Sequence, residues 1–432
     1  MNYYSTSNKS IRASFSEAAV QGQAPDRGLY FPETIPQLPS GFMAALDSLS
    51  KEEIAFTVMK PYVGDEISST DLQRIVTETV SFPFPLVPVT KDIATLELFH
   101  GPTLAFKDVG ARFMSRCLSH FVKKGDREIT VLVATSGDTG GAVAHGFYGV
   151  EGVNVVILYP SGKVSLTQEV QLTTLGKNIR AIEVDGSFDD CQQMVKNAFM
   201  DEDLQRSLFL TSANSINVAR WLPQQLYYFF AYQQWKDKTG APVISVPSGN
   251  FDNICAGLLA YCSGLPVSHF VAACNANDTV PQFLTSGIYS AKPSVPTLSN
   301  AMDVGNPSNF VRIMEMFKHH LPALKNILTG YTVTDEETKA VIKDVYLQYS
   351  YVLDPHGAVG YLALQRHLAA TGGRGYFLET AHPVKFYDAI EPVIGEKIAI
   401  PESIAILLQQ QKKATRMKPD DAALKALLLD VR

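Results

Sequence analysis

Apolar runs that alternate with helical stretches from Glu128 onward constrain the fold more than any other feature of this sequence. Residues 128–134, 153–158, 179–184 and 242–246 are short, nearly continuous apolar runs, which are typical of strands buried on both faces. Helical spacing predicts helices over residues 165–174 and 188–200, and a further strand is expected at residues 376–379. Strands separated by helices in this way favour an α/β fold with mostly parallel sheets.

Length and composition exclude several classes of protein. The 432 residues suggest two or three domains, and the 46% of hydrophobic residues argue against extended disorder. The net charge of −6 gives no reason to expect nucleic-acid binding, and no apolar run is long enough to span a membrane. The five cysteines form no CxxC pair, which is typical of reduced thiols. The first ten residues lack the apolar core of a signal peptide, so we expect a cytoplasmic protein.

Lys107 stands at a predicted junction between a strand and a helix. Gly-Pro at residues 101–102 breaks a strand, and apolar residues recur at helical spacing over 109–121. A lysine beside Phe106 and near the positive end of a helix has its charged form disfavoured, so its amine becomes nucleophilic. A lysine that forms a Schiff base requires this property. The alternative is a surface lysine that pairs with Asp108.

Two loops rich in small residues each connect a predicted strand to a predicted helix. The first reads Thr-Ser-Gly-Asp-Thr-Gly-Gly over residues 135–141, and the second reads Pro-Ser-Gly-Asn-Phe-Asp-Asn over residues 247–253. Backbone amides at the start of a helix can bind an anion, so both loops are candidate phosphate sites. The alternative is a tight turn that needs glycine only for its backbone conformation. Neither loop matches the nucleotide-binding patterns GxxxxGK[ST] or GxGxxG.

Three further segments carry signals of their own. Residues 214–220, Asn-Ser-Ile-Asn-Val-Ala-Arg, place amides, a hydroxyl and a cation before an aromatic helix predicted over residues 221–235. Core packing explains the aromatic residues of that helix but not the polar group that precedes it. Residues 286–309 are rich in Ser, Pro, Asn and Gly and predict a long functional loop. The tail from Gln409 is predicted to be a charged helix without chemistry.

Six motifs together resemble those of the threonine synthases, pyridoxal-phosphate enzymes with the tryptophan-synthase-β-like fold (fold type II). They are HGPTLAFKDVGARFM (100–114), ATSGDTGGA (134–142), YPSGK (159–163), NSIN (214–217), PSGNFDN (247–253) and TAHPVKF (380–386). The resemblance covers most of residues 1–390 and fades in the tail. We therefore expect two parallel-sheet α/β domains and an N-terminal domain. The expected bounds are 1–92 for the N-terminal domain, 93–127 with 240–432 for the large cofactor-binding domain, and 128–239 for the small domain.

The resemblance implies a role for each matching residue, and it implies no metal. Lys107 would hold pyridoxal phosphate covalently through its amine and later move protons. Thr380 would hydrogen-bond the pyridine nitrogen, and a neutral hydroxyl there leaves that nitrogen unprotonated. The other implied cofactor contacts are Ser248, Gly249, Asn250, Phe251, Asp252 and Asn253. The loop Ser136, Gly137, Asp138 and Thr139 would face the substrate, and the candidates for the substrate's phosphate are Lys163, Asn214, Ser215, Asn217 and Arg220.

The reaction that the resemblance implies converts O-phospho-L-homoserine and water to L-threonine and phosphate, by γ-elimination and then addition of water at the β-carbon. This is the last step of threonine biosynthesis. The nearest alternative is a lyase that releases a 2-oxo acid, ammonia and phosphate from the same substrate with the same loops. A non-catalytic scaffold is disfavoured because Lys107 and both glycine loops are intact. We expect a small-molecule substrate, no nucleic-acid or membrane partner, and a monomer or homodimer.

The sequence departs from the family pattern at two places. Asp252 stands where the family more often has glycine, so we expect Asp252 to adopt the left-handed backbone that asparagine and aspartate tolerate. Its carboxylate should point away from a bound phosphate, because like charges repel. The segment Ser-Thr-Ser-Asn at residues 5–8 replaces the usual Ser-Thr-Arg-Gly, which predicts the loss of one polar contact near the site.

Overall fold

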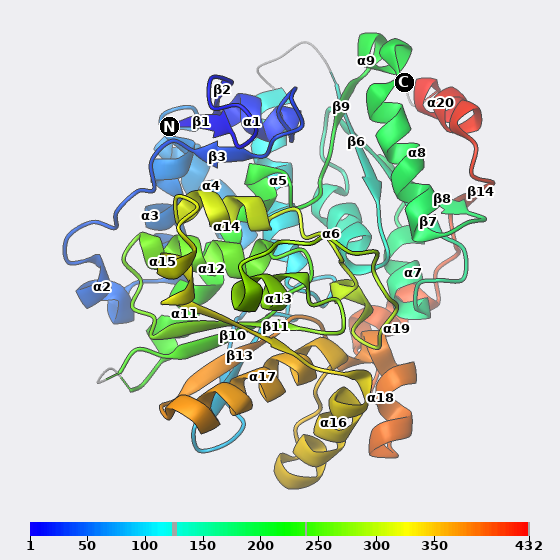
Figure 1. Cartoon of the computed structure of the whole chain (residues 1–432). Helices are drawn as coiled ribbons and strands as arrows, with labels where there is room; N and C mark the ends of the chain where they lie inside the picture. Colours follow the sequence, from blue (N-terminus) through cyan, green and yellow to red (C-terminus); the bar gives the residue numbers. More distant parts are fainter. Residues whose placement is uncertain (123–127, 238–239, 431–432) are drawn as a thin grey trace.

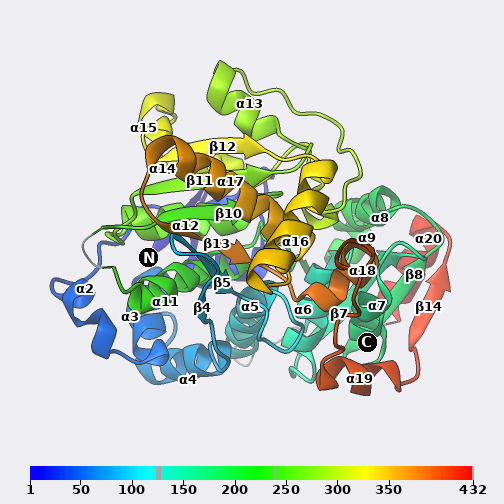
Figure 2. The ribbon, with the colours of Figure 1, turned by 90° about the horizontal axis from the view of Figure 1, so that it is seen from below.

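The computed structural model describes residues 1–122, 128–237 and 240–430, and these residues contain two mainly parallel sheets and a small N-terminal sheet (Figure 1). The larger sheet has the strand order β12-β11-β10-β13-β5-β4, which can be followed from top to bottom in Figure 2. All its neighbouring strands pair in parallel except β4, which is antiparallel to β5. The strands are β4 (Leu86–Pro88), β5 (Ile93–Glu97), β10 (Val243–Pro247), β11 (His269–Cys274), β12 (Leu328–Thr332) and β13 (Gly375–Glu379).

The smaller sheet has the order β14-β8-β7-β6-β9, and every pair of neighbours is parallel. Its strands are β6 (Ile129–Ala134), β7 (Val153–Pro160), β8 (Ile179–Val184), β9 (Phe209–Thr211) and β14 (Ala414–Met417). Every residue of β6 is buried, because helices cover both faces of the sheet. The predicted α/β class with parallel sheets is therefore confirmed.

Helices surround both sheets, and several begin where the sequence supplies a capping box. Ser165 and Gln168 cap one helix, and Thr334 and Glu337 cap another, each satisfying backbone amides that a helix start leaves free. The helices on the larger sheet are α12 (Asp252–Cys262), α13 (Thr279–Ser286), α14 (Phe310–Met316), α15 (Leu321–Lys325), α16 (Asp335–Tyr349), α17 (Pro355–Thr371) and α18 (Tyr387–Ile394). Those on the smaller sheet are α6 (Asp138–Phe147), α7 (Leu166–Thr173), α8 (Phe188–Met200), α9 (Glu202–Ser207), α19 (Glu402–Leu408) and α20 (Asp421–Leu429).

The N-terminal region packs on the junction between the two sheets. It contains β1 (Asn2–Ser5), β2 (Arg12–Ser14), β3 (Tyr30–Pro32), α1 (Phe15–Gln21), α2 (Phe42–Ala45), η1 (Leu46–Ser48), α3 (Lys51–Val63) and α4 (Ser69–Thr79). Helix α5 (Lys107–Val122) lies at this junction, in contact with α4, α1 and α6. The main hydrophobic core is continuous through these elements, because it includes Phe15, Ile75, Phe113 and Phe147. No helix within the described ranges combines the length and the apolar character needed to cross a membrane.

Some helices begin or end at residues other than those predicted from the sequence. Helices α6 and α12 start at Asp138 and Asp252, so each small-residue loop runs directly into a first helical turn. The helix predicted over residues 221–235 is divided into α10 (Val218–Trp221), η2 (Leu222–Gln225) and α11 (Leu226–Gln234). Pro223 explains the division, because proline has no N–H to continue a helical ladder. Residues 123–127 and 238–239, where two of the predicted domain bounds fall, lie outside the described residues.

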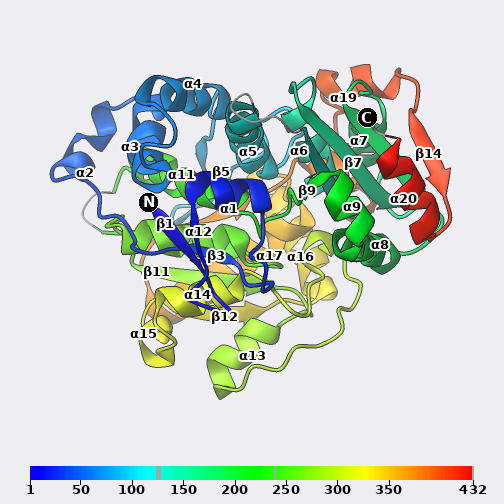
Figure 3. The same ribbon diagram turned by 90° about the horizontal axis from the view of Figure 1, so that it is seen from above.

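The C-terminal tail differs most from the sequence-based domain bounds. The bounds place residues 240–432 in the large domain, but β14 pairs in parallel with β8 of the smaller sheet, with Ala414 opposite Ala181. Helix α20 then packs on α8 and α9, as Figure 3 shows beside the smaller sheet. Leu424 and Leu428 of α20 complete the apolar cluster on that face, which gives the tail a physical reason to return there. The two termini lie on opposite sides of the molecule (Figure 1).

Candidate active site

Lys107 is the first residue of α5, and the residues before it lie along the chain that leaves β13. The Phe106 N–H donates to the Thr380 carbonyl at 2.8 Å, and the His382 N–H donates to the Leu104 carbonyl at 3.0 Å. These two hydrogen bonds fix the Lys107 backbone against the segment that begins with Thr380. The structure therefore places the predicted nucleophile and the predicted pyridine-nitrogen partner beside each other, at the carboxyl end of the larger sheet, where parallel sheets bind ligands.

Charged side chains surround the Lys107 amine. Burial lowers the pKa of Lys107 below its ordinary value, Asp252 opposes this effect, and Arg220 adds to it. The Lys107 ammonium also lies 4.4 Å from the centre of the Phe106 ring. Weaker contributions come from Asp138, which raises the lysine pKa, and from Lys385, which lowers it. A lysine whose neutral form is favoured in this way can act as a nucleophile and as a base.

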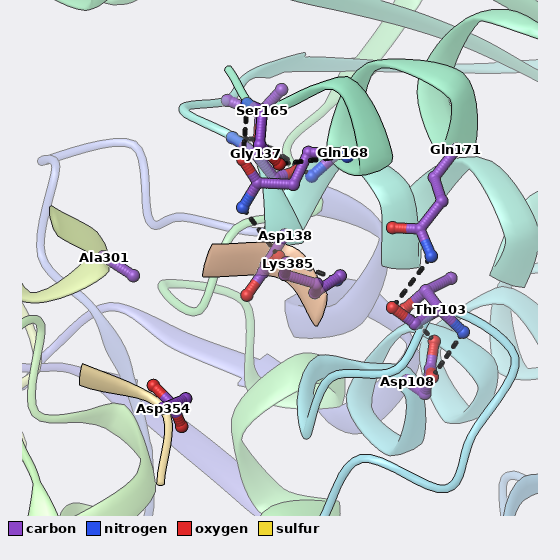
Figure 4. A network of polar contacts seen from close by, with 12 residues as sticks. Thr103, Asp108, Gly137, Asp138, Ser165, Gln168, Gln171, Ala301, Asp354 and Lys385 are labelled. Atoms are coloured by element: carbon purple, nitrogen blue, oxygen red, sulfur yellow. Dashed lines mark hydrogen bonds and ion pairs between the residues drawn. The ribbon is translucent and has the colours of Figure 1, made fainter. Parts of the chain in front are cut away.

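Asp138 and Lys385 form a buried ion pair between the two sheets. The Lys385 Nζ lies 2.7 Å from Asp138 Oδ1, and the Gln168 Nε2 donates to the same oxygen at 3.0 Å (Figure 4). Although burial raises the pKa of Asp138, the Lys385 ammonium holds it below the ordinary value. Asp138 belongs to the first turn of α6, whereas Lys385 lies in η4 (Pro383–Phe386), after β13.

The second small-residue loop leaves the start of α12 without a side-chain cap. The left-handed residue is Phe251, with φ 62°, and not Asp252 as expected from the sequence. Asp252 is instead the first helical residue, and its Oδ2 accepts a hydrogen bond from Gln224 Nε2 at 2.9 Å. A Cβ on Gly249 would lie 2.6 Å from Met302 Cα, so only glycine fits beneath that turn. The first backbone amides of α12 therefore point out of the helix end without an acceptor inside it.

The predicted residues Ser215 and Asn250 come together at this loop. The Asn250 Nδ2 donates to Ser215 Oγ at 2.9 Å, and its Oδ1 accepts from both the backbone and the hydroxyl of Ser308. Asn309 Nδ2 also donates to Ser215 Oγ, at 3.1 Å. This network joins the segment before α10 to the start of α12 and to the loop before α14.

Arg220 is buried and points back toward Lys107. Its Nη1 donates to the Lys107 carbonyl at 3.3 Å. Burial lowers the pKa of Arg220 to about 10, and Asp252 opposes the change, so the guanidinium keeps its charge at neutral pH. The packing is close, because a Cβ on Gly110 would lie 2.6 Å from the Arg220 carbonyl oxygen. A cation thus lies beside Lys107.

Comparisons with known proteins match the whole chain. A family model described as "Threonine synthase N terminus" matches residues 2–80, "Pyridoxal-phosphate dependent enzyme" matches residues 91–376, and "Threonine synthase, C-terminal" matches residues 357–428. Threonine synthase of Escherichia coli (strain K12) is 44% identical over 434 residues, with 100% of both chains covered. A structure of threonine synthase with bound pyridoxal phosphate from Brucella melitensis has a TM-score of 0.94 and 34% identity, covering 100% of this chain and 99% of that one.

The chain belongs to the threonine synthase family.

The family match extends into the C-terminal tail, beyond the range in which the resemblance was expected to fade. The C-terminal threonine synthase model includes β14 and most of α20. The fold agrees as well, since the structure of threonine synthase from Escherichia coli has a TM-score of 0.93 over 100% of both chains. The tail is therefore part of the threonine synthase fold, and the predicted fold type II class is confirmed.

The residues at the start of α12 fit the pyridoxal phosphate that this family uses. Asn253 Nδ2 is buried and has no hydrogen-bond partner among the described residues, while Tyr228 holds its Oδ1 at 2.7 Å. An unpaired buried donor beside an uncapped helix start is suited to an acceptor-rich anion such as phosphate. The Thr380 hydroxyl also makes no hydrogen bond within the described part of the chain, so it is available to an acceptor such as a pyridine nitrogen.

The remaining predicted residues of this threonine synthase homologue lie at different places. Asn217 is buried and caps α10, and its Nδ2 donates to the Ala19 carbonyl at 2.8 Å, so its hydrogen bonds serve the protein backbone. Asn214 and Thr139 are half-buried, and Gly137 precedes α6, where a Cβ would lie 2.5 Å from the Gln168 side chain. Ser136 and Lys163 are exposed, whereas Arg220 is buried. Their predicted roles stay predictions.

Sequence reasoning missed two buried cations near the site. Lys385 belongs to the motif TAHPVKF, and a lysine in an apolar segment after a strand was the signal available. Arg312 of α14 donates to the carbonyls of Tyr30, Ser215 and Ile216, and its guanidinium lies 4.4 Å over the Trp221 ring. Arg312 thereby holds the segment before α10 against the N-terminal region. No local pattern around residue 312 indicated that role.

Proposed function

We propose that this chain converts O-phospho-L-homoserine and water to L-threonine and phosphate, with pyridoxal phosphate as its cofactor. Membership of the threonine synthase family supports the reaction. The observation that carries the proposal is the position of Lys107. Its amine, of lowered pKa, shares a charged cluster with Asp252 at the uncapped start of α12 and with the buried cation Arg220. A reaction between a phosphorylated cofactor and a phosphorylated substrate requires a site for each phosphate.

Pyridoxal phosphate supplies an electron sink for carbanions next to an amino-bearing carbon. On this proposal, the backbone amides of Gly249–Asn253 hold the cofactor's phosphate at the start of α12. Ser248 leads into this loop, and its own N–H donates to the Ala273 carbonyl at 2.8 Å. The Thr380 hydroxyl donates to the pyridine nitrogen. Lys107 Nζ binds the cofactor and then takes and returns the protons of the substrate, which its lowered pKa favours.

The substrate side of the site is formed by the loop Ser136–Thr139 and by the segment before α10. Arg220 binds the substrate's phosphate and stabilises the negative charge that leaves with it. Ser215 and Asn214 orient that phosphate, with Ser215 fixed by Asn250 and Asn309. Lys163 is a further cation for the same group, and its exposed position requires it to act from the rim of the site.

The alternative is a lyase that forms a 2-oxo acid, ammonia and phosphate from the same substrate. Product analysis separates the two reactions. The purified protein is incubated with pyridoxal phosphate and O-phospho-L-homoserine, and threonine, 2-oxo acid and phosphate are quantified. Threonine in an amount equal to phosphate supports the synthase, whereas 2-oxo acid in that amount establishes the lyase.

Lys107→Ala supplies the matching test of the site. This variant should lose turnover and the visible absorbance of bound cofactor, because no amine remains to hold it. Lys339→Ala, at an exposed lysine of α16, is the control and should behave as the parent. Normal turnover in Lys107→Ala would overturn the assignment.

Two further properties, the location in the cell and the oligomeric state, belong to this proposal. A cytoplasmic location and a state of monomer or homodimer are proposed from the sequence. Fractionation of cells and the molar mass in solution test them.

A further inference from the structure

Two buried carboxyl groups lie behind the site, at the end of β13 and the start of α17. Glu379 is the last residue of β13 and Asp354 caps α17, and both are fully buried. The Asp354 N–H donates to Glu379 Oε1 at 2.6 Å. The other oxygen of each group, Glu379 Oε2 and Asp354 Oδ2, has no hydrogen-bond partner among the described residues. A Cβ on Gly357 would lie 1.6 Å from Glu379 Oε2, so the carboxyl group fits tightly against the first turn of α17.

A single proton shared by Glu379 and Asp354 would remove both the charge repulsion and the lack of a hydrogen-bond donor. Two ionised carboxylates buried side by side repel each other, and each also lacks a donor for one oxygen. A proton held between Glu379 and Asp354 removes one of the two charges and provides the missing donor. The remaining charge lies at the N-terminus of α17, where a helix stabilises it.

His356 continues the chain of contacts from Asp354 toward the cofactor site. Its Nδ1 lies 2.5 Å from Asp354 Oδ1, and its Nε2 accepts from the Ala301 N–H at 3.2 Å. Because Nε2 accepts, the proton of a neutral imidazole is on Nδ1 and is donated to Asp354. The Phe386 ring, 4.8 Å from the His356 ring, fixes the plane of the imidazole.

This chain of contacts reaches the cofactor site at two places, the turn over Gly249 and the residue Thr380. Ala301 belongs to η3 (Asn300–Met302), and this turn covers Gly249, the glycine that precedes the start of α12. At the opposite end, Glu379 is followed directly by Thr380, whose carbonyl holds the chain before Lys107. Figure 4 shows Asp354 and Ala301 on the same side of the Asp138–Lys385 ion pair.

We propose that Glu379 and Asp354 share one proton, and that this acid pair, together with His356, positions Thr380 and the turn over Gly249. The affinity for pyridoxal phosphate therefore falls when the shared proton is lost at alkaline pH. The three residues are positioning residues, since they act through Thr380 and through the Ala301 turn. The inference rests on cofactor use and not on which product the enzyme forms.

The groups that face the acid pair favour the protonated state. Glu97 of β5 stands opposite Glu379 in the sheet register. Burial raises the pKa of Glu379 well above its ordinary value, and Asp354 and Glu97 raise it further. Glu97 itself accepts from Tyr351 at 2.9 Å and contacts His100 at 2.7 Å. Burial raises the pKa of Tyr351 as well, which keeps its phenol neutral.

The other neighbours add little positive charge. Burial lowers the pKa of His382 to about 4, with His100 as a further cause, so His382 is neutral at neutral pH. Asp303 lies near His356, and burial raises the pKa of Asp303. A raised carboxyl pKa has a defined consequence for stability. The folded protein binds the proton more tightly than the unfolded chain, so the stabilisation is complete below about pH 4.3, the ordinary glutamate value, and is lost as the pH rises through the folded pKa.

The test measures the dissociation constant of pyridoxal phosphate from the apoprotein, by visible absorbance, from neutral to alkaline pH. The parent should lose affinity as the pH rises. Glu379→Gln replaces the shared proton with an amide that cannot ionise, so its affinity should stay nearly constant over the same range. A decline in Glu379→Gln equal to that of the parent would overturn the shared proton.

His356→Phe tests the contact with the Ala301 turn. It keeps a ring against Phe386 but removes both hydrogen bonds, and pyridoxal phosphate should bind about tenfold more weakly at neutral pH. His367→Phe, at a second buried histidine of α17, is the matched control and should bind as the parent does. Parent-like affinity in His356→Phe would overturn the positioning role.

A second measurement keeps the proposal testable if a variant folds poorly. The unfolding temperature of the parent apoprotein should fall with rising pH more steeply than that of Glu379→Gln, and equal slopes would overturn the proposal. Threonine formation by the parent is assayed separately. Absence of threonine would count against the proposed function and would leave the cofactor-binding result intact.

Discussion

The Lys385 ammonium lies 2.7 Å from the Asp138 carboxylate, and the two buried side chains join chain segments from different sheets. Both charges are buried away from bulk solvent, so each depends on the other. The pair also faces Lys107, since both residues affect the Lys107 pKa. One ion pair therefore links the packing of the two sheets to the electrostatics of the reactive amine.

Lys385→Met should destabilise the protein by about 3–5 kcal/mol, because it leaves the Asp138 carboxylate buried without a partner. The double variant Lys385→Met with Asp138→Asn should recover much of that loss, since no buried charge remains. Denaturant unfolding of the apoprotein measures both. The pKa of Asp138 is lowered, so the pair's stabilisation is present above pH 3.8 and is lost as the pH falls through the folded pKa. Equal stability of the single and double variants would contradict this account.

Thr380→Val should keep the fold and lower the turnover rate. The hydroxyl makes no hydrogen bond within the described residues, so its loss removes only a contact to the cofactor, at a cost of about 1 kcal/mol. Thr380→Asp places a charged acceptor opposite the pyridine nitrogen and should be much less active than the parent. Steady-state kinetics with saturating cofactor measures both variants. Parent-like activity in Thr380→Asp would contradict the assignment.

Arg220→Ala should lower kcat/KM for O-phospho-L-homoserine. The expected loss of transition-state stabilisation is about 2–5 kcal/mol, the cost of removing one member of a desolvated charge pair. The affinity for pyridoxal phosphate should hardly change, because the start of α12 holds that phosphate. Lys163→Ala, measured in parallel, shows whether the exposed lysine shares the role. If Arg220→Ala instead lost cofactor and kept its affinity for substrate, the two phosphate sites would be interchanged.

Arg312→Lys should destabilise the protein and weaken substrate use, although the charge is retained. A lysine ammonium cannot reproduce the planar fork that donates to the Ser215 and Ile216 carbonyls and stacks on Trp221. Thermal unfolding and kcat/KM measure the two effects. Arg206→Lys is the control, because Arg206 pairs with Glu202 at the exposed surface and its replacement should have little effect.

The sequence predicted the elements whose signals are local. The buried strand β6 and the helix start at Lys107 agree with the apolar runs and spacing that predicted them, since burial on both faces requires continuous apolar residues. The division of the aromatic helix was missed, although Pro223 marked the place. A proline near the start of a predicted helix is compatible with either outcome, and tertiary packing decides between them.

Other features depend on contacts between residues far apart in the chain. Strand β14 has only four residues, and its exposed Thr415 and Arg416 give it no apolar pattern. Only its pairing with β8 makes it a strand. Lys385 and Arg312 were missed for the same reason. Asp138, the partner of Lys385, and the Ser215 and Ile216 carbonyls that accept from Arg312 are more than 90 residues away in the sequence, and only Asn309, among the Arg312 partners named by hydrogen bonds, lies nearby.

Because β14 and α20 return to the smaller sheet, truncation of the C-terminal tail would affect the whole fold. Without β14, the backbone groups of β8 would face water as an unpaired edge, which is a template for adding a strand from another molecule. Without α20, the apolar surface beneath Leu424 and Leu428 would also be uncovered. The tail holds none of the residues assigned to the reaction, so we expect its removal to promote aggregation while the proposed catalytic residues stay in place.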